Sequence, residues 1–221
     1  MNNLVSALEL FGFVRISEEA RYPLVIHSVP GSGKTSLIRS LIKLDGDFEA
    51  FTAGVPDTPN LEGCYIRSHF EGCASNKKLS ILDEYLTVEN WEGFDALFSD
   101  PYQNDKSPLV ASYVSKKTKR FGKSTCAYLA DYGFEVESEI EDLVVRGSPF
   151  ELKVEGQLIC FGKAAVELAL SHCAEFKLPC EVRGSTFDVV TLLKSEEPSS
   201  VNRHLFYVGC TRHRKKLIIL E

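Results

Sequence analysis

The chain has 221 residues, of which 44% are apolar and 25% are charged, and its formal net charge at pH 7 is −6. This composition provides enough apolar material for a buried core and excludes an intrinsically disordered protein. The negative charge excludes a protein that coats nucleic acid with a uniformly basic surface, so any contact with a polyanion must be local. Seven cysteines without a C-x-x-C pair favour reduced thiols in a cytosol over a disulfide framework. We expect no signal peptide and no transmembrane segment, because the apolar runs are far shorter than the roughly 20 residues that span a bilayer.

In chain order, the apolar residues predict an alternation of helices and strands. Leu4, Leu8 and Phe11 recur at helical spacing, which predicts a short amphipathic helix packed on the body of the protein. A run rich in β-branched residues at 23–29 predicts a buried strand, which a glycine-rich loop and a helix then follow. We expect further strands at 48–55, 79–85, 95–100 and 109–114. Strands that alternate with helices favour a mostly parallel sheet.

The composition changes at residues 115–123, a basic segment that we interpret as a hinge between two α/β lobes. The predicted N-terminal lobe covers residues 1–114, and the C-terminal lobe covers residues 124–221. In the second half we expect helices at 123–134 and 163–173, and strands at 143–147, 157–162, 185–193 and 215–221. This half has no second glycine-rich loop.

The segment SVPGSGKT at residues 28–35 has the pattern of a phosphate-binding loop, except that Ser28 replaces the first glycine of G-x-x-x-x-G-K-[ST]. That position opens the loop and needs only a small side chain. Such a loop points backbone N–H groups at phosphate oxygens, and the following helix N-terminus adds about half a positive charge. Lys34 is expected to reach the β- and γ-phosphates of ATP, and the Thr35 hydroxyl to bind Mg²⁺. The predicted nucleotide-binding residues are Gly31, Ser32, Gly33, Lys34, Thr35 and Ser36.

Two later strands end in acidic residues that suit nucleotide hydrolysis. Asp83 follows an apolar run and is the expected carboxylate of the Mg²⁺ site. Its neighbour Glu84 is a candidate to polarise an attacking water. Asp100 ends the next apolar strand, and Gln103 beyond it is a candidate to position water near the γ-phosphate.

Arg212 and Arg214 lie where a helix-like segment gives way to the last predicted strand. The local sequence around these arginines is consistent with two interpretations. An arginine from one lobe can stabilise transition-state charge on a nucleotide held by the other and couple hydrolysis to closure of the lobes. Alternatively, the cations simply cap a solvated helix end.

Seven short motifs occur in order: SVPGSGKT, TAGVP, ILDEY, LFSDPYQ, TKRFGK, RGSTFDVVTL and YVGCTRHRK. With this set the chain resembles, over essentially its whole length, the superfamily 1 helicase domain of positive-strand RNA plant viruses. More narrowly, it is similar to the family of first movement proteins of the triple gene block of potexviruses, carlaviruses and their relatives. The resemblance implies two small RecA-like lobes with mostly parallel sheets, a minimal form of the superfamily 1 helicase core.

The resemblance also implies roles for individual residues. The implied catalytic set is Lys34, Asp83, Glu84, Gln103, Arg120 and Arg212. In this set Arg120 contacts the γ-phosphate and Arg212 is the arginine finger. Gly184 and Thr186 fall in the fifth motif, which usually touches the nucleic-acid backbone. Arg183 stands where related helicases often have glutamine, which predicts that ATP hydrolysis is retained more readily than duplex unwinding.

The basic segment 115–123 is the candidate contact for RNA. Its cations can neutralise phosphates without reading sequence, although a charge run is also typical of a solvated face. Tyr113 and Phe121 are candidates to stack on bases, with burial in the core as the alternative. The predicted RNA-binding residues are Lys116, Lys117, Lys119, Lys123, Gly184 and Thr186.

The resemblance implies a cell-to-cell movement protein that carries the viral genome through plasmodesmata and suppresses host RNA silencing. The implied partners are single-stranded viral RNA, viral coat protein, the other triple gene block proteins, host silencing factors and further copies of the chain. The implied location is the host cytoplasm, at plasmodesmata or in inclusions. Two hypotheses stay open: an RNA-stimulated Mg-ATPase that is also a weak RNA helicase, and an ATP-binding module for RNA and coat protein that needs no hydrolysis. The glutamine and arginine motifs disfavour a third, a small-molecule kinase.

Overall fold

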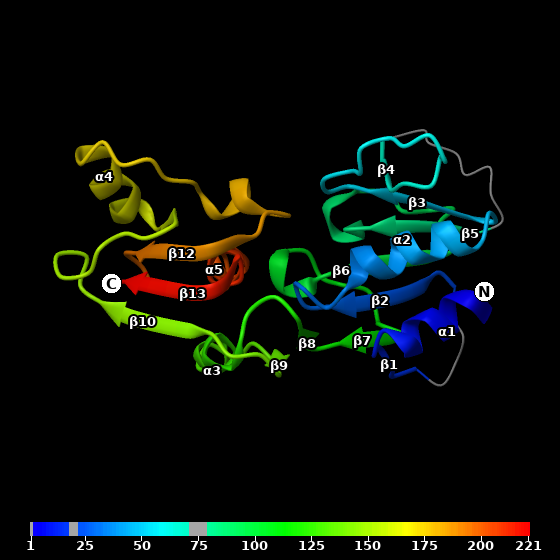
Figure 1. Cartoon of the computed structure of the whole chain (residues 1–221), viewed down its shortest axis with the longest axis horizontal. Coiled ribbons are helices and arrows are strands. Elements are labelled where there is room, and N and C mark those ends of the chain that lie inside the picture. The colour runs from blue at the N-terminus through cyan, green and yellow to red at the C-terminus, as the bar shows by residue number, and fades with distance from the viewer. Residues whose placement is uncertain (1, 18–21, 71–78) are drawn as a thin grey trace. The chain divides into compact units, whose positions relative to one another are not determined.

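The computed structural model of the chain describes residues 2–17, 22–70 and 79–221, and it contains both helices and strands in each half of the chain (Figure 1). The chain divides into two compact units, Met1–Lys116 and Lys117–Glu221. This boundary falls within the basic segment 115–123, and the role of that segment as a hinge stays a prediction. No helix in the described ranges is both long and apolar enough to cross a membrane.

The N-terminal unit is built on a sheet whose strands, over the described residues, follow the order β1-β7-β2-β6-β5-β3-β4. The pairing of β1 with β7 is antiparallel, and the other neighbouring pairs are parallel. The mostly parallel sheet expected from the alternation is therefore confirmed. The strands are β1 (Val14–Arg15), β2 (Leu24–Ser28), β3 (Phe48–Thr52), β4 (Arg67–Ser68), β5 (Leu79–Asp83), β6 (Ala96–Ser99) and β7 (Tyr113–Ser115).

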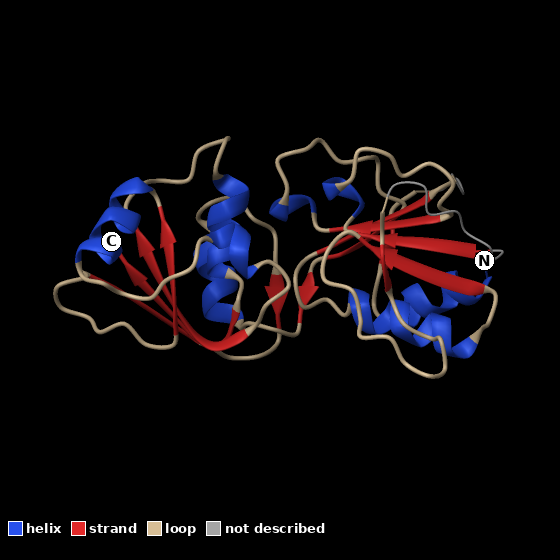
Figure 2. Cartoon of the chain, turned by 90° about the horizontal axis from the view of Figure 1, so that it is seen from above, coloured by secondary structure: helices blue, strands red, loops and turns tan. Residues whose placement is uncertain are grey.

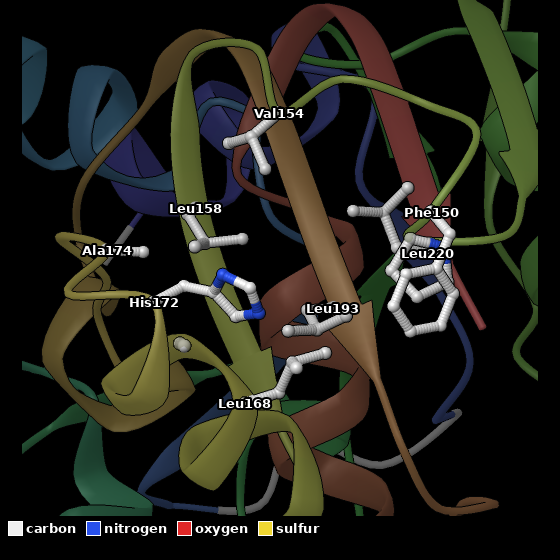
Figure 3. A pocket seen from close by; sticks show the side chains of 10 residues that line it. Phe150, Val154, Leu158, Leu168, His172, Ala174, Leu193 and Leu220 are labelled. Atoms are coloured by element: carbon white, nitrogen blue, oxygen red, sulfur yellow. The ribbon is translucent and has the colours of Figure 1, made fainter.

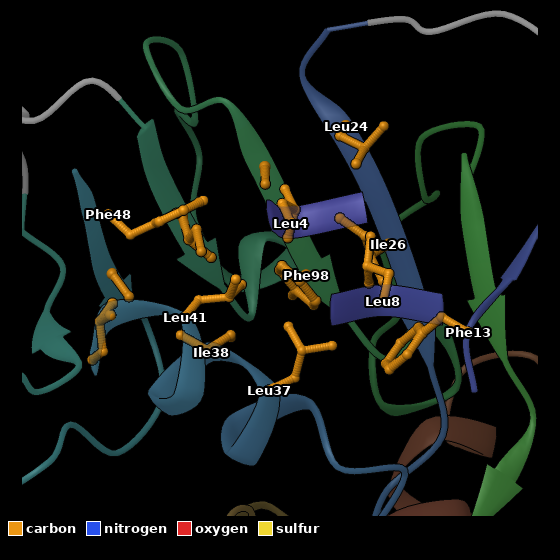
Figure 4. Close-up of a cluster of buried hydrophobic side chains, with 14 of the residues drawn as sticks. Leu4, Leu8, Phe13, Leu24, Ile26, Leu37, Ile38, Leu41, Phe48 and Phe98 are labelled. Carbon is orange, nitrogen blue, oxygen red and sulfur yellow. The ribbon is translucent and has the colours of Figure 1, made fainter. Parts of the chain in front are cut away.

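Helices α1 (Asn2–Leu10) and α2 (Lys34–Leu44) cover one face of this sheet, where their apolar stripes meet β2 and β6 (Figure 4). The opposite face packs against the short 3₁₀ helix η1 (Tyr85–Thr87) and the segment after it. Successive residues of a strand point to opposite faces, so Ile26 joins the first cluster and Val25 the second. The first cluster includes Leu4, Leu8, Leu37, Ile38, Leu41 and Phe98, and Phe11 packs against it.

Several strands are shorter than their apolar runs predict. β5 ends at Asp83 because Glu84 takes a left-handed conformation with φ 59°, which no strand can continue. β3 ends at Thr52, whose Oγ1 accepts the Gly54 N–H in a turn. β7 begins only at Tyr113, and the N–H of Leu109 donates to a tyrosine hydroxyl rather than to a strand.

The C-terminal unit has a parallel four-stranded sheet in the order β10-β13-β12-β11, with helices on its faces (Figure 2). A small parallel pair, β8 with β9, precedes it. The strands are β8 (Lys117–Thr118), β9 (Glu137–Ser138), β10 (Leu143–Gly147), β11 (Gln157–Phe161), β12 (Phe187–Lys194) and β13 (His213–Leu220). The helices are α3 (Lys123–Ala130), α4 (Lys163–Ser171) and α5 (Arg203–Cys210), with 3₁₀ turns η2 (Pro101–Gln103) in the N-terminal unit and η3 (Pro179–Val182) in this one.

Alternation along β12 again separates the two faces of the sheet. Leu193 joins the apolar cluster under α4, whereas Leu192 faces α5 so closely that a Cβ on Gly209 would lie 2.9 Å from its Cδ1. The α4 face leaves a cavity of about 180 Å³, lined by Leu158, Leu168, Leu193, Leu220 and Phe150 among others (Figure 3). His172 is the polar side chain in this lining, so the cavity does not suit a phosphate group.

Candidate functional site

The glycine-rich loop joins the carboxyl end of β2 to the first residue of α2, in the N-terminal unit. Gly31 and Gly33 have φ values of +78° and +102°, a region in which only glycine is free of strain. The Leu37 N–H donates to the Gly33 carbonyl, so the helix starts at the last glycine. In the sheet, β6 lies directly between β2 and β5. Because these strands are parallel, the carboxyl end of β2, which leads into the loop, and the carboxyl end of β5, which carries Asp83, lie at the same edge of the sheet.

Lys34 is the centre of a cluster of acidic side chains. Its side chain is 10% exposed, and its Nζ lies 2.9 Å from Glu84 Oε1 and 3.9 Å from Asp83 Oδ1. Burial on its own would lower the Lys34 pKa, but the carboxylates of Glu84, Asp83 and Asp100 outweigh burial and raise that pKa. Lys34 is therefore charged, as a phosphate-binding lysine must be.

Glu84 is held in place by its backbone and by its neighbours. Its left-handed φ of 59° is uncommon for a residue with a side chain and costs roughly 1–3 kcal/mol. Its N–H donates to Asp83 Oδ1 over 3.1 Å, and the Ser99 hydroxyl lies 3.5 Å from its Oε2. The left-handed conformation of Glu84 directs its side chain toward Lys34, whereas Asp83 is the last residue of β5.

Asp100 has a larger part in this cluster than its sequence context indicates. Its side chain is fully buried, and its Oδ2 accepts a hydrogen bond of 2.7 Å from the Gln103 amide. Burial raises the pKa of Asp100 to about 6, although nearby Lys34 opposes the shift. Burial likewise raises the pKa of Asp83. Gln103, the predicted sensor of the γ-phosphate, is thus oriented by a carboxylate that itself interacts with Lys34.

His27 and Tyr85 join the strand before the loop to the segment after Glu84, a contact that sequence patterns did not reveal. Their rings are stacked, and His27 Nε2 lies 2.9 Å from the Tyr85 hydroxyl, which accepts the Leu109 N–H. Burial and the charge of Lys34 lower the pKa of His27 to about 4. The imidazole is neutral at physiological pH, so its Nε2 can accept the tyrosine proton.

The residues of the loop fit a nucleotide with its magnesium ion. The hydroxyls of Ser28 and Ser32 are buried and have no hydrogen-bond partner among the described residues. Unpaired buried hydroxyls in a glycine-rich loop before a helix N-terminus suit phosphate oxygens. Thr35, in the first turn of α2, is half-buried, and Asp83 offers the oxygen ligand that Mg²⁺ prefers. Ser36 is exposed on the same turn.

The two predicted arginines lie in the C-terminal unit and meet at one residue. Arg120 Nη1 donates to the Thr211 carbonyl over 3.4 Å, and Arg212 Nη2 to the Thr211 hydroxyl over 2.9 Å. α5 ends at Cys210 and β13 starts at His213, so Arg212 occupies the turn between them while Arg214 lies in the strand. Both arginines therefore donate to Thr211, and their roles in phosphoryl transfer stay predictions.

The predicted RNA-binding lysines differ from one another in their surroundings. Lys117 forms an ion pair with Glu139, and Lys123 with Glu141. Lys116 and Lys119 are exposed, as is Gly184, which has a φ of +79° in the turn before β12, where Thr186 is half-buried. Their contact with RNA stays a prediction. Tyr113 and Phe121 are only 2% and 0% exposed because they belong to the core, so the base-stacking hypothesis for them is wrong.

The sequence of the chain is similar to those of known proteins. Residues 24–221 match the family model of the viral superfamily 1 RNA helicase core domain. The movement and silencing protein TGBp1 of Apple stem pitting virus (isolate PA66) is 40% identical, and the match covers 100% of both chains. TGBp1 of Chrysanthemum virus B is also 40% identical, over 100% of this chain and 96% of that protein.

Solved helicase structures share the fold at low sequence identity. The arterivirus nonstructural protein 10 helicase, solved in complex with DNA, matches with a TM-score of 0.64 and 18% identity over 90% of this chain. Another structure of an arterivirus nonstructural protein 10 helicase matches with a TM-score of 0.59 and 17% identity over the whole chain. The chain spans 60% and 56% of the lengths of these two helicases. The predicted α/β fold of the superfamily 1 helicase core is confirmed. The chain belongs to the viral superfamily 1 RNA helicases and, within them, to the movement and silencing proteins TGBp1 of potexviruses, carlaviruses and their relatives.

Proposed function

We propose that the chain is an RNA-stimulated, magnesium-dependent ATPase that serves viral movement between cells. The observation that carries this proposal is the position of Lys34, buried at the start of a helix, 2.9 Å from Glu84 and 3.9 Å from Asp83. Nucleotide hydrolysis requires a lysine, a metal-binding carboxylate and a second carboxylate, and here all three follow strands that end at the same edge of the sheet. The family to which the chain belongs supports the same proposal.

In this proposal the loop binds the phosphates through its backbone N–H groups and the hydroxyls of Ser28 and Ser32. Lys34 exchanges its contact with Glu84 for the β- and γ-phosphates. Thr35 and Asp83 would hold Mg²⁺, which neutralises charge on the phosphate oxygens when it is bound.

Once Lys34 has left it, Glu84 is free to accept a proton from the attacking water. Gln103 donates to Asp100 over 2.7 Å. Its amide oxygen would accept a hydrogen bond from that water, and an amide N–H would donate to the phosphate. We propose that Arg120 and Arg212 add positive charge during phosphoryl transfer, as the family resemblance implies. RNA contacts are assigned to Lys116, Lys117, Lys119, Lys123, Gly184 and Thr186.

The experiment that tests this proposal measures phosphate release with and without single-stranded RNA across a salt series. The wild type should be stimulated by RNA, and the stimulation should fall as salt rises because contacts with phosphates release counterions. Arg212→Ala should bind ATP but lose most of its turnover. A rate that does not respond to RNA at any salt concentration contradicts a coupled motor.

A second measurement separates hydrolysis from binding. Glu84→Gln should keep the nucleotide-binding loop intact while removing the group that activates water. If this variant still supports movement and silencing suppression in infected tissue, the alternative hypothesis of an ATP-binding module is correct. If both activities are lost with a folded protein, hydrolysis is part of the mechanism.

The biological setting remains part of the proposal. The names of the relatives support roles in movement and silencing. We propose single-stranded viral RNA, the other triple gene block proteins, viral coat protein, host silencing factors and further copies of the chain as partners. The proposed location is the host cytoplasm, including plasmodesmata and inclusions. Affinity purification from infected tissue with wild type and Glu84→Gln would identify partners that depend on nucleotide hydrolysis.

A further inference from the structure

A buried carboxylate in the C-terminal unit joins two segments that are far apart in sequence. Asp142 Oδ1 accepts the N–H groups of Ser124 and Thr125, at 3.0 Å and 3.3 Å, and so caps the start of α3. Its Oδ2 accepts the Thr125 hydroxyl over 2.6 Å and lies 3.0 Å from His213 Nε2, at the start of β13. Thr125 Oγ1 is also 3.0 Å from that nitrogen, so the three side chains form a closed triangle.

The triangle is shielded from solvent and strongly bonded. The side chains of Asp142 and His213 are both 0% exposed, and Thr125 is fully buried. Burial would raise the pKa of Asp142, but hydrogen bonds from His213, Thr125 and the Gly122 N–H outweigh burial and lower that pKa to about 2. The carboxylate is therefore ionised at neutral pH, and hydrogen bonds to a charged group are about twice as strong as neutral ones.

The triangle lies next to the segments that carry the two arginines through one of its corners, His213. His213 directly follows Arg212, whose carbonyl accepts the Phe187 N–H over 2.8 Å. On the other side, Arg120 precedes Phe121, and the Phe121 and His213 rings lie 5.9 Å apart between centroids. Both arginines donate to Thr211. A flexible arginine loses side-chain entropy when it is ordered, so fixing its backbone in advance lowers the cost of placing its charge.

We propose that Thr125, Asp142 and His213 are positioning residues that hold Arg120 and Arg212 at a fixed spacing for catalysis. This inference rests on the proposed function, in which the two arginines act in phosphoryl transfer. The triangle belongs to the C-terminal unit, whereas the nucleotide-binding loop belongs to the N-terminal unit. Loss of the triangle should therefore slow turnover and leave nucleotide binding unchanged. A misplacement of about 1 Å can lower a rate roughly 100-fold, so a clear effect on kcat is expected.

The test uses Thr125→Val, which removes one hydroxyl with little change in shape, and Thr125→Ser, which restores it. Thr191→Val is the matched control, because Thr191 is also fully buried. Its hydroxyl donates to the Glu155 carbonyl over 2.7 Å, a contact that includes neither arginine. Thr125→Val should lower kcat for RNA-stimulated ATP hydrolysis about tenfold or more, with KM and the affinity for a fluorescent ATP analogue unchanged. Thr125→Ser should recover most of kcat, and Thr191→Val should lower the unfolding temperature without changing kcat.

A second readout does not depend on turnover. In protein labelled with ¹⁵N-arginine, the Nε–H signals of Arg120 and Arg212, assigned with lysine variants, should be dispersed in the wild type and in Thr191→Val. In Thr125→Val the two signals should shift toward the chemical shift of mobile, solvent-exposed arginines. Unchanged arginine signals in a folded Thr125→Val protein would overturn the inference. A wild type with dispersed signals but no phosphate release would instead contradict the proposed function and leave the positioning role standing.

Discussion

Lys34 and Glu84 are 50 residues apart in sequence, yet the Nζ of one lies 2.9 Å from Oε1 of the other. The ion pair occupies the lysine that a nucleotide phosphate would bind. Removing Lys34 would leave three carboxylates close together without their cation, and breaking a buried pair in this way is strongly destabilising. The glutamate is therefore the better position for a substitution that tests nucleotide binding.

We predict that Glu84→Gln binds ATP at least as tightly as the wild type and hydrolyses it at least about 100-fold more slowly. The amide no longer competes with phosphate for the lysine charge, and it cannot take a proton from water. Titration with a fluorescent ATP analogue and single-turnover phosphate release measure the two effects. Binding that is weaker by tenfold, in a protein with an unchanged circular dichroism spectrum, would show that the ion pair does not restrain Lys34.

The second prediction concerns stability and pH. His27 has a pKa of about 4 in the folded protein, below its ordinary value of 6.5. Between these values the unfolded chain binds more protons than the folded one, so stability is complete above about pH 6.5 and falls as the pH is lowered to 4. His27 is partly exposed, and after allowance for screening we expect a loss on the order of 2 kcal/mol.

Urea unfolding of the wild type and His27→Gln at pH 7 and pH 4.5 measures this loss. His27→Gln should be less sensitive to pH by that amount, and His172→Gln, which changes an exposed histidine, should behave like the wild type. Equal sensitivity of the wild type and His27→Gln would exclude His27 as the cause.

The third prediction separates two lysines of the basic segment. Lys119 is exposed and has no ion-pair partner in the described part of the chain, whereas Lys117 is paired with Glu139. If both contact RNA, Lys119→Ala should reduce the slope of log Kobs against log salt by roughly 0.7, the value for one contact with a single strand. Lys117→Ala should change that slope less, because its charge is already partly neutralised. Filter binding to a homopolymer RNA at four salt concentrations provides the slopes, and the reverse order would contradict the assignment.

The fourth prediction concerns Gly122, at the start of α3. A Cβ at this position would lie 2.4 Å from the Asp142 backbone nitrogen, far inside contact distance. Gly122→Ala should therefore destabilise the protein by about 1–3 kcal/mol or more, as overpacking does. Gly46→Ala is the control, since nothing lies within 4 Å of its added Cβ. Thermal unfolding of both variants tests this prediction. Equal unfolding temperatures would exclude a steric clash between the added Cβ and Asp142.

Local patterns predicted most of the fold because they act over neighbouring residues. The strand, glycine loop and helix around Lys34 follow from β-branched residues, two glycines and apolar residues at helical spacing. The strand ends were predicted less well, because they depend on single backbone conformations. The left-handed Glu84 ends β5, and no residue type at that position indicates it.

The candidate site was only partly predictable because many of its contacts join distant segments. His27 and Tyr85 are 58 residues apart, and Asp142 and His213 are 71 residues apart. Asp142 stands before a strand in an acidic stretch, a context typical of a solvated loop. Only the packing of α3 against that loop turns it into a buried helix cap.

The two sheets have separate hydrophobic clusters, one that includes Leu37 and Phe98 and one that includes Leu193 and Ile218. Separate cores allow the two units to melt in separate steps, so one unfolding free energy need not describe the whole chain. A ligand stabilises the part of a protein that binds it, by about 2.7 kcal/mol at one hundred times its Kd. In a calorimeter, ATP should therefore raise the melting temperature of one transition and leave the other in place, which would identify the unit that holds the nucleotide without any assay of turnover.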